Sequence, residues 1–182
     1  MSISTEIAQT DVDYFEVVNG FRVAIAPMGA FAGTVASLLV SYLNQFALPR
    51  KLGWAISEVL FDLGAGRNQR RPDLAFIGRE RWQRMERRPA VDPPAWRVVP
   101  NLAGEVVSPS NTAAEIETKL LEYFDAGVEI VWVLHPVLRR FYVYDSPTSA
   151  RVLTSDDVLD GGCVLPGFQL RLADFFDAMP PL

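Results

Sequence analysis

Two apolar segments of this 182-residue chain each carry one carboxylate, and they constrain its fold more than any other feature. The first runs from Arg71 to Ile77 and contains Asp73, and the second runs from Ala103 to Ser110 and contains Glu105. Both are typical of short buried strands, where a charge needs a partner. Two carboxylates facing each other there repel unless a cation lies between them, and a hard divalent ion such as Mg²⁺ is the simplest one.

The composition predicts a single packed domain spanning residues 1–182. The chain is 49% hydrophobic and 11% aromatic, which favours a soluble globule. The only cysteine, Cys163, excludes an internal disulfide framework and cannot form a zinc site alone. No basic-then-apolar signal opens the chain, and the stretch from Phe31 to Leu43 looks too short and too polar to span a bilayer. We therefore expect a cytoplasmic protein without a membrane partner.

The charge is acidic overall but locally basic. A net charge of −5 and a pI near 4.9 argue against a general nucleic-acid-binding surface. Residues 67–97 nevertheless carry a net charge of +5, because nine arginines there outnumber four acids. The segment is either a phosphate-binding patch or a solvated surface. The arginines are Arg67, Arg70, Arg71, Arg79, Arg81, Arg84, Arg87, Arg88 and Arg97, and the three that flank Asp73 (Arg67, Arg70 and Arg71) are the candidates for nucleic-acid binding.

The order of predicted elements indicates an α/β fold with a mixed sheet flanked by helices. Asn19-Gly20 predicts an N-terminal β-hairpin, and Thr112 to Glu115 forms a capping box that begins a helix ending at Gly127. Extra strands are expected near the C-terminus. The predicted elements are a hairpin over 14–26, a helix over 31–46, strands over 54–63, around Asp73, and over 102–107, 129–134 and 140–144, one helical turn within 79–99, tail strands over 152–153 and 163–170, and a last helical turn over 172–176.

A lysine on the predicted helix is placed to reach the acidic residues. Ala103, Glu105 and Val107 alternate onto one face of their strand. Lys119 and Tyr123 are four residues apart and are neighbours on the helix surface. Lys119 lies at the edge of the apolar stripe, so its stem can pack while its ammonium reaches the sheet.

This ordered set resembles the PD-(D/E)XK nuclease superfamily. The segments RRPDLAFI, LAGEVVSPSNTAAEIETKLLEYFDAGVEIVWVLHP and VLPGFQLRLADFF more closely resemble the Uma-two family of bacterial endonuclease-like proteins. The resemblance covers residues 14–177 and implies a restriction-endonuclease-like core. It also implies a Mg²⁺- or Mn²⁺-dependent endonuclease that hydrolyses phosphodiester bonds of DNA.

The resemblance implies roles for individual residues. Asp73, Glu105 and the main-chain carbonyl of Val106 would be metal ligands. Superfamily members usually carry a lysine two residues after the second acid, where this chain has Val107, so Lys119 is the expected replacement. Tyr123 would hydrogen-bond a phosphate or the lysine, and Glu58 would be an outer acid. A homodimer is expected, since cutting both strands of a duplex is simplest with two related sites.

Simpler interpretations stay open for each of these residues. Asp73 is also typical of a turn after Pro72, Tyr123 of core packing, and Glu58 of an exposed strand residue. A Glu105–Lys119 ion pair without metal would satisfy the buried charge. The alternative function is therefore a non-catalytic binding or assembly module that keeps the nuclease fold. Catalysis by a serine nucleophile would need His135, the only histidine, as its base. Neither Ser108 nor Ser110 lies in a nucleophile-elbow pattern, so this chemistry is not expected.

Overall fold

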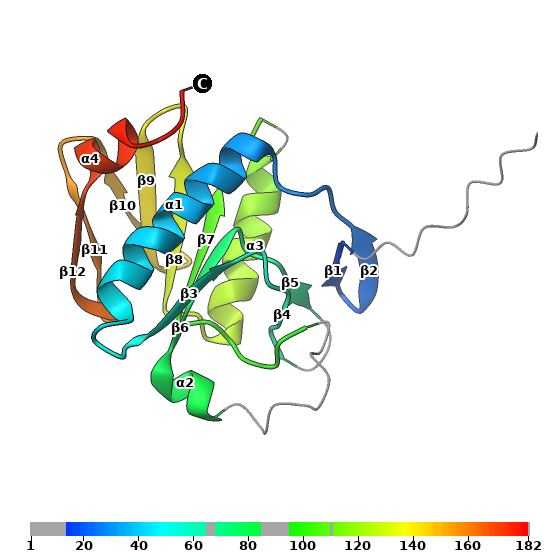
Figure 1. The fold of residues 1–182 in the computed structure, drawn as a ribbon. Helices are drawn as coiled ribbons and strands as arrows, with labels where there is room; N and C mark the ends of the chain where they lie inside the picture. The colour runs from blue at the N-terminus through cyan, green and yellow to red at the C-terminus, as the bar shows by residue number, and fades with distance from the viewer. Residues whose placement is uncertain (1–13, 65–67, 85–94, 110, 182) are drawn as a thin grey trace, which may run out of the picture.

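The structure of the protein is a computed structural model that describes residues 14–64, 68–84, 95–109 and 111–181. A six-stranded mixed sheet lies at its centre (Figure 1). Its strands, in order across the sheet, are β10 (Ser149–Leu153), β9 (Arg140–Ser146), β8 (Ile130–His135), β7 (Leu102–Val106), β6 (Leu74–Gly78) and β3 (Gly53–Ser57). Only β7 and β8 are parallel, and α3 (Ala113–Ala126) forms the crossover between them.

Helices cover both faces of this sheet (Figure 1). Side chains alternate along β7, so Leu102 and Val106 join the hydrophobic core beneath α1 (Ala30–Ala47), whereas Ala103 joins the core beneath α3. The first core also contains residues of α4 (Leu172–Asp177) and of the two-stranded sheet formed by β11 (Val158–Gly161) and β12 (Leu165–Arg171). The predicted fold class is confirmed.

A smaller antiparallel sheet extends the molecule on one side. Its order is β2 (Phe21–Ala24), β1 (Phe15–Val18), β5 (Gln69–Arg70) and β4 (Phe61–Asp62). The predicted N-terminal hairpin is present, with Asn19 at φ 52° and Gly20 at φ 85°. Both central residues of a two-residue hairpin turn need such positive φ values, which is why Asn-Gly predicts it.

Two predicted strands are each divided in the structure. The strand expected over 54–63 ends as β3 at Ser57, because Glu58 adopts a positive φ of 53°, and continues as β4 in the other sheet. The strand expected around Asp73 is divided into β5 and β6 at Pro72, which has no N–H to donate to a ladder. Asp73 therefore lies just before β6 and not at the centre of a strand.

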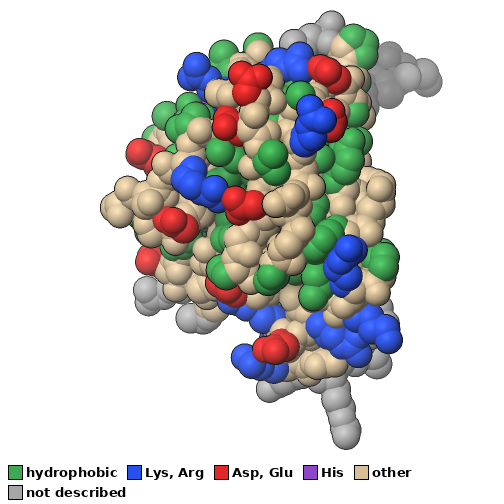
Figure 2. Space-filling view, turned by 90° about the vertical axis from the view of Figure 1, so that its left-hand side faces the viewer, with side chains coloured by type: hydrophobic (Ala, Val, Ile, Leu, Met, Phe, Trp, Pro, Cys, Tyr) green, Lys and Arg blue, Asp and Glu red, His purple; other side chains and the backbone are tan. Residues whose placement is uncertain are grey.

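The arginine-rich segment is only partly described. Its predicted helical turn is α2 (Arg79–Arg84), and residues 85–94 lie outside the described residues. Lys and Arg side chains gather at the lower end of the face shown in Figure 2, the end at which α2 lies in Figure 1. Arg79, Arg84 and Arg97 are exposed, so this part of the basic segment is solvated.

α1 is longer than its predicted range and is long and apolar enough to cross a membrane. The prediction that this segment is too short and too polar was therefore wrong, because the helix continues to Ala47. Here Val35, Leu39 and Leu43 are fully buried against the sheet. Core helices of soluble proteins meet the same length and hydropathy criterion.

Candidate active site

Asp73 and Glu105 lie opposite each other where the two sheets meet. The antiparallel pairing of β6 and β7 places Leu74 opposite Gly104, so the next residues, Asp73 and Glu105, share one end of the sheet. The Val106 N–H donates to Asp73 Oδ2 at 2.6 Å. A Cβ at Gly104 would lie only 2.7 Å from Leu74 Cγ, so glycine permits this close approach of the strands.

Glu105 is buried and accepts two side-chain hydrogen bonds from α3. Lys119 Nζ lies 2.9 Å from Glu105 Oε2, and the Tyr123 hydroxyl donates to Glu105 Oε1 at 2.6 Å. The capping box at Thr112 fixes where α3 begins, and the four-residue spacing places both donors on its inner face. The contact expected between the helix lysine and the sheet is present. Tyr123 is fully buried and does not line the pocket. Its hydroxyl donates to Glu105 and not, as expected, to a phosphate or the lysine.

The charges of this group are coupled. Burial and the neighbouring Glu105 carboxylate raise the pKa of Asp73 from 3.8 to about 7. Burial raises the pKa of Tyr123 well above its usual value, and Glu105 raises it further, so the phenol stays protonated and donates. Burial alone would lower the pKa of Lys119, but Glu105 and Glu16 outweigh burial and raise it above its ordinary value. Lys119 therefore stays a cation.

A second buried network surrounds the lysine and was missed from the sequence. Glu16 of β1 is 3% exposed, and its Oε2 accepts from Arg70 Nη1 at 2.7 Å. Arg70 also forms a two-bond pair with Glu122 of α3, from Nε at 2.5 Å and from Nη2 at 2.9 Å. Glu16 could have been found from the sequence by the same signal that marked Glu105, since it is a carboxylate within an otherwise apolar strand.

Arg70 consequently does not present its guanidinium to a nucleic acid. It is 6% exposed, and Glu16 and Glu122 occupy it on both sides. The prediction of a phosphate-binding role at Arg70 is corrected for this reason, and Arg67 lies outside the described residues. Arg71 also lines the pocket but is only half-buried; its Nη1 donates to the Glu58 main-chain carbonyl, and its guanidinium lies over the Tyr14 ring. Its Nε is buried and has no hydrogen-bond partner among the described residues.

Glu58 connects the hairpin to this end of the sheet. Its Oε1 accepts from the Tyr14 hydroxyl at 2.5 Å and from the Met28 N–H at 3.3 Å. Tyr14 precedes β1 and Met28 follows β2, so Glu58 ties both ends of the hairpin to the end of β3. Its positive φ is uncommon for a residue other than glycine. The interpretation of Glu58 as an exposed strand residue is corrected, since it is half-buried after the strand has ended.

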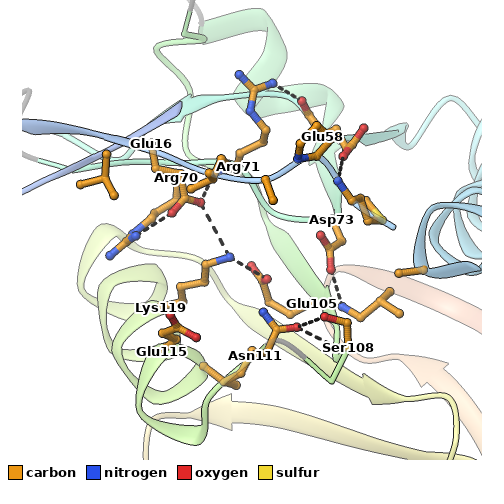
Figure 3. Close-up of a pocket in the computed structure, with 18 of the residues that line it drawn as sticks. Glu16, Glu58, Arg70, Arg71, Asp73, Glu105, Ser108, Asn111, Glu115 and Lys119 are labelled. Carbon is orange, nitrogen blue, oxygen red and sulfur yellow. Dashed lines mark hydrogen bonds and ion pairs between the residues drawn. The ribbon is translucent and has the colours of Figure 1, made fainter. Parts of the chain in front are cut away.

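An open pocket of about 740 Å³ contains these groups (Figure 3). Its walls are the hairpin, the residues before α1, the start of β6, the end of β7 and the first half of α3. Asp73, Glu105 and Lys119 all line it, as do Glu58 and Arg71. The three residues predicted to form the core of the site are therefore brought together beside space for a substrate.

The residues at the pocket fit a hard divalent cation. In the described part of the chain, no group of three or more His, Cys, Asp or Glu side chains is arranged to hold a metal. The carboxylates of Asp73 and Glu105 with the Val106 carbonyl would supply three oxygen ligands, which suits Mg²⁺ or Mn²⁺ completed by water and substrate. Charged side chains that are buried or half-buried here have a net formal charge of −2. They are the acids Glu16, Glu58, Asp73, Glu105 and Glu122 and the cations Arg70, Arg71 and Lys119.

Comparisons with known proteins identify the family and the fold. The profile of the Uma2 (Uma-two) family, described as "Putative restriction endonuclease", matches residues 6–173. Among solved structures, a "putative nuclease belonging to DUF820" from Anabaena variabilis has a TM-score of 0.74 and 19% sequence identity, over 90% of this chain and 89% of that one. None of the curated proteins matches. Because the family profile spans nearly the whole sequence, the chain belongs to the Uma2 family of nuclease-like proteins.

Proposed function

We propose that this protein is a Mg²⁺- or Mn²⁺-dependent endonuclease that hydrolyses phosphodiester bonds of DNA. The observation that supports it most is the meeting of Asp73 and Glu105 across β6 and β7, beside Lys119 and an open pocket. Membership of a family described as restriction endonucleases agrees with a nucleic-acid substrate.

Each residue would have a distinct task. Asp73, Glu105 and the Val106 carbonyl would hold the metal, which when bound activates water and neutralises phosphate charge. The Lys119 ammonium would stabilise the negative charge that develops on the phosphorane. Tyr123 acts through Glu105, because its hydroxyl fixes that carboxylate and does not face the pocket. Arg71 is the candidate for a substrate phosphate, because it is less buried than Arg70, the other pocket arginine, which is paired with Glu16 and Glu122.

A titration of Mn²⁺ followed by calorimetry tests this proposal. The wild type should bind Mn²⁺ with defined stoichiometry, and Asp73→Asn should not. Asp145→Asn is the matched control, since it removes the same charge at an exposed position of β9. Circular dichroism should show that all three proteins are folded. If Asp73→Asn binds Mn²⁺ as well as the wild type does, the metal site is not at Asp73.

Cleavage assays then address the reaction and its substrate. Supercoiled DNA, single-stranded DNA and RNA should each be incubated with Mg²⁺ or Mn²⁺. Cleavage of DNA that disappears in Asp73→Asn and Glu105→Gln is the expected result. Cleavage of RNA alone, or activity that survives both substitutions, would refute the proposal.

A non-catalytic binding or assembly module is the second candidate. It is favoured by the observation that Lys119 and Tyr123 each donate to one oxygen of Glu105, so protein groups alone compensate this buried carboxylate. This function predicts no Mn²⁺ binding by the wild type, either alone or with a DNA duplex present. The same titration therefore separates the two candidates.

We also propose that the working form is a homodimer, because two related sites can cut both strands of a duplex. Sedimentation velocity would give a mass of twice the 20.2 kDa chain. A monomer that still makes double-strand breaks would contradict this proposal.

A further inference from the structure

Lys119 lies between two buried carboxylates that come from different parts of the fold. Its Nζ is 2.9 Å from Glu105 Oε2 on β7 and 3.7 Å from Glu16 Oε1 on β1 (Figure 3). Both glutamate side chains are only 4% exposed, and the lysine side chain is 18% exposed. Glu105 belongs to the central sheet, whereas Glu16 belongs to the N-terminal hairpin. The hairpin therefore supplies the second anionic partner of the lysine.

Glu16 is itself held in place from the other side. Arg70 Nη1 donates to its Oε2 at 2.7 Å, and the Arg71 main-chain N–H donates to its Oε1 at 3.0 Å. Arg70 is in turn fixed by its pair with Glu122. The Glu16 carboxylate has partners on β5, on the residue after β5 and on α3, which restrict its orientation. Lys119 thus meets a rigid partner and not a mobile surface acid.

The origin of the lysine explains why a second partner matters. Lys119 reaches the site from α3 on a flexible stem, and ordering such a stem costs rotamer entropy. Glu105, its closer partner, is also a proposed metal ligand, so Glu105 alone would draw the ammonium toward the metal position. Glu16 attracts the ammonium toward β1 and thereby opposes the pull of Glu105.

We propose that Glu16 is a positioning residue: from the N-terminal hairpin, it holds the Lys119 ammonium beside Glu105 in the arrangement needed for catalysis. The inference rests on the proposed nuclease function. It also makes the hairpin a part of the active site, although the hairpin lies outside the central sheet.

The first test is the kinetics of Glu16→Gln, which keeps the shape of the side chain and removes its charge. We expect kcat for DNA cleavage to fall about 10- to 100-fold, as for other groups that orient a metal-site residue. KM should change little, because Glu16 is 3% exposed and its carboxylate oxygens are already paired with Arg70, the Arg71 N–H and Lys119. Glu117→Gln is the matched control, since Glu117 is an exposed acid on α3, the helix that carries Lys119. This variant should leave kcat unchanged. Equal kcat values for Glu16→Gln and the wild type would overturn the proposal.

The second test does not depend on activity. The chain has only two lysines, Lys51 and Lys119, and Lys51 is exposed and serves as an internal standard. Acetylation with an N-hydroxysuccinimide ester, followed by mass spectrometry, gives the ratio of the two labelling rates. In Glu16→Gln the Lys119/Lys51 ratio should rise about fivefold, the size expected from losing one ion pair. Glu117→Gln should leave the ratio unchanged.

The two tests separate the possible failures. An unchanged ratio in folded Glu16→Gln overturns the positioning role, whatever the activity. A raised ratio in a protein whose wild type cleaves no DNA supports the placement of Lys119 by Glu16 and refutes the nuclease function. If Glu16→Gln does not fold, Glu16→Asp replaces it, because it keeps the charge for Arg70 and withdraws the carboxylate by one methylene. A ratio equal to that of the wild type in Glu16→Asp then overturns the proposal.

Discussion

Asp73 and Glu105 place two acidic side chains together in a largely buried position, where burial and the Glu105 carboxylate raise the pKa of Asp73. Glu105 is compensated by Lys119 and Tyr123, whereas Asp73 receives one main-chain N–H. Of the two, Asp73 is therefore the residue whose charge is least compensated without a metal. Its protonation should be visible in the stability of the protein.

The free energy of unfolding of the metal-free protein should fall between pH 4 and pH 7. Burial and Glu105 raise the pKa of Asp73 from 3.8 in its ordinary state to about 7, so the folded protein holds this proton more tightly than the unfolded chain. The resulting stabilisation is present below pH 4 and is lost as pH rises through 7, with a slope on the order of 1 kcal/mol per pH unit. Urea unfolding of the wild type and Asp73→Asn, in EDTA, measures the difference. Parallel pH profiles for the two proteins would contradict it.

Arg70 and Arg71 are neighbours in the sequence, but their substitution should affect different properties: protein stability for Arg70 and DNA affinity for Arg71. Arg70→Gln leaves Glu122 without its paired arginine and Glu16 without the closer of its two cations, and should destabilise the fold by about 3 kcal/mol. Arg71→Gln should instead lower the affinity for DNA and reduce the slope of log K against log salt by about 1. Thermal unfolding and fluorescence anisotropy measure the two effects. Arg84→Gln, on exposed α2, is the control for both.

The position of the lysine can be tested by moving it. Lys119→Met should abolish cleavage, and adding Val107→Lys should restore part of it, because residue 107 follows Glu105 by two, directly after β7, and is half-buried next to the pocket residue Val106. The kcat of the double variant, compared with that of Lys119→Met, is the measurement. Equal rates would show that an ammonium at residue 107 cannot replace the one on α3.

At the scale of the elements, α3 carries the donors that hold Glu105, and its ends are fixed by local interactions. Thr112 Oγ1 accepts from the Glu115 N–H at 3.2 Å, and the Glu115 side chain accepts from the Thr112 N–H at 2.8 Å. Gly127 ends the helix at φ 96°, a left-handed conformation. The start and end of α3 therefore set the angular position of Lys119 and Tyr123.

Removing this cap should weaken the helix. Thr112→Ala should lower the free energy of unfolding by about 1 kcal/mol, because the Glu115 N–H loses its acceptor. Thr118→Ala is the matched control: Thr118 is exposed inside the same helix and bonds only the preceding turn, at Ala114 O. Its effect should be much smaller. Chemical denaturation compares the two, and equal losses would mean that the cap does not stabilise α3.

The N-terminal hairpin is small, but it makes several contacts with the candidate site. Each strand has four residues, and all four residues of β2 are exposed. Yet Glu58 fixes both of its ends, and Glu16 joins it to Arg70 and Lys119. Apolar packing holds it as well, since Phe15 and Val17 are buried in a small cluster with Leu60 and Ala95.

At the scale of the whole molecule, the site lies where the central sheet, the small sheet and α3 meet. Packing at this junction is tight, since a Cβ at Gly104 would meet Leu74 at 2.7 Å. Leu74, a core residue, directly follows Asp73, a pocket residue, so the hydrophobic core and the site are adjacent here. A change at this junction should disturb both stability and metal binding.

Two glycine substitutions test this coupling. Gly104→Ala should cost about 1–3 kcal/mol of stability through overpacking, and it should also weaken Mn²⁺ binding. Gly33→Ala, within α1, should raise stability by about 1 kcal/mol, because the added Cβ meets only Met28 Sδ at 3.8 Å. Thermal unfolding and calorimetry measure both. Wild-type Mn²⁺ affinity in Gly104→Ala would show that the core and the site are independent.

The sequence by itself determined the features that depend on local interactions. The Asn19-Gly20 turn, the capping box of α3, the left-handed Gly127 and the face shared by Lys119 and Tyr123 follow from residues a few positions apart. The two acidic segments were also recognisable, because a carboxylate beside or within a buried apolar strand is costly, although Asp73 lies just before its strand.

Only the tertiary structure decided which partner each buried charge has. Glu16 and Arg70 are 54 residues apart and Arg70 and Glu122 are 52 apart, so no local pattern pairs them. The bend at Glu58 depends on Tyr14 and Met28, which arrive from the hairpin, and it divides a strand that reads as continuous. Local interactions are fixed by spacing along the chain, whereas the pairing of buried charges depends on which elements meet when the two sheets and α3 assemble.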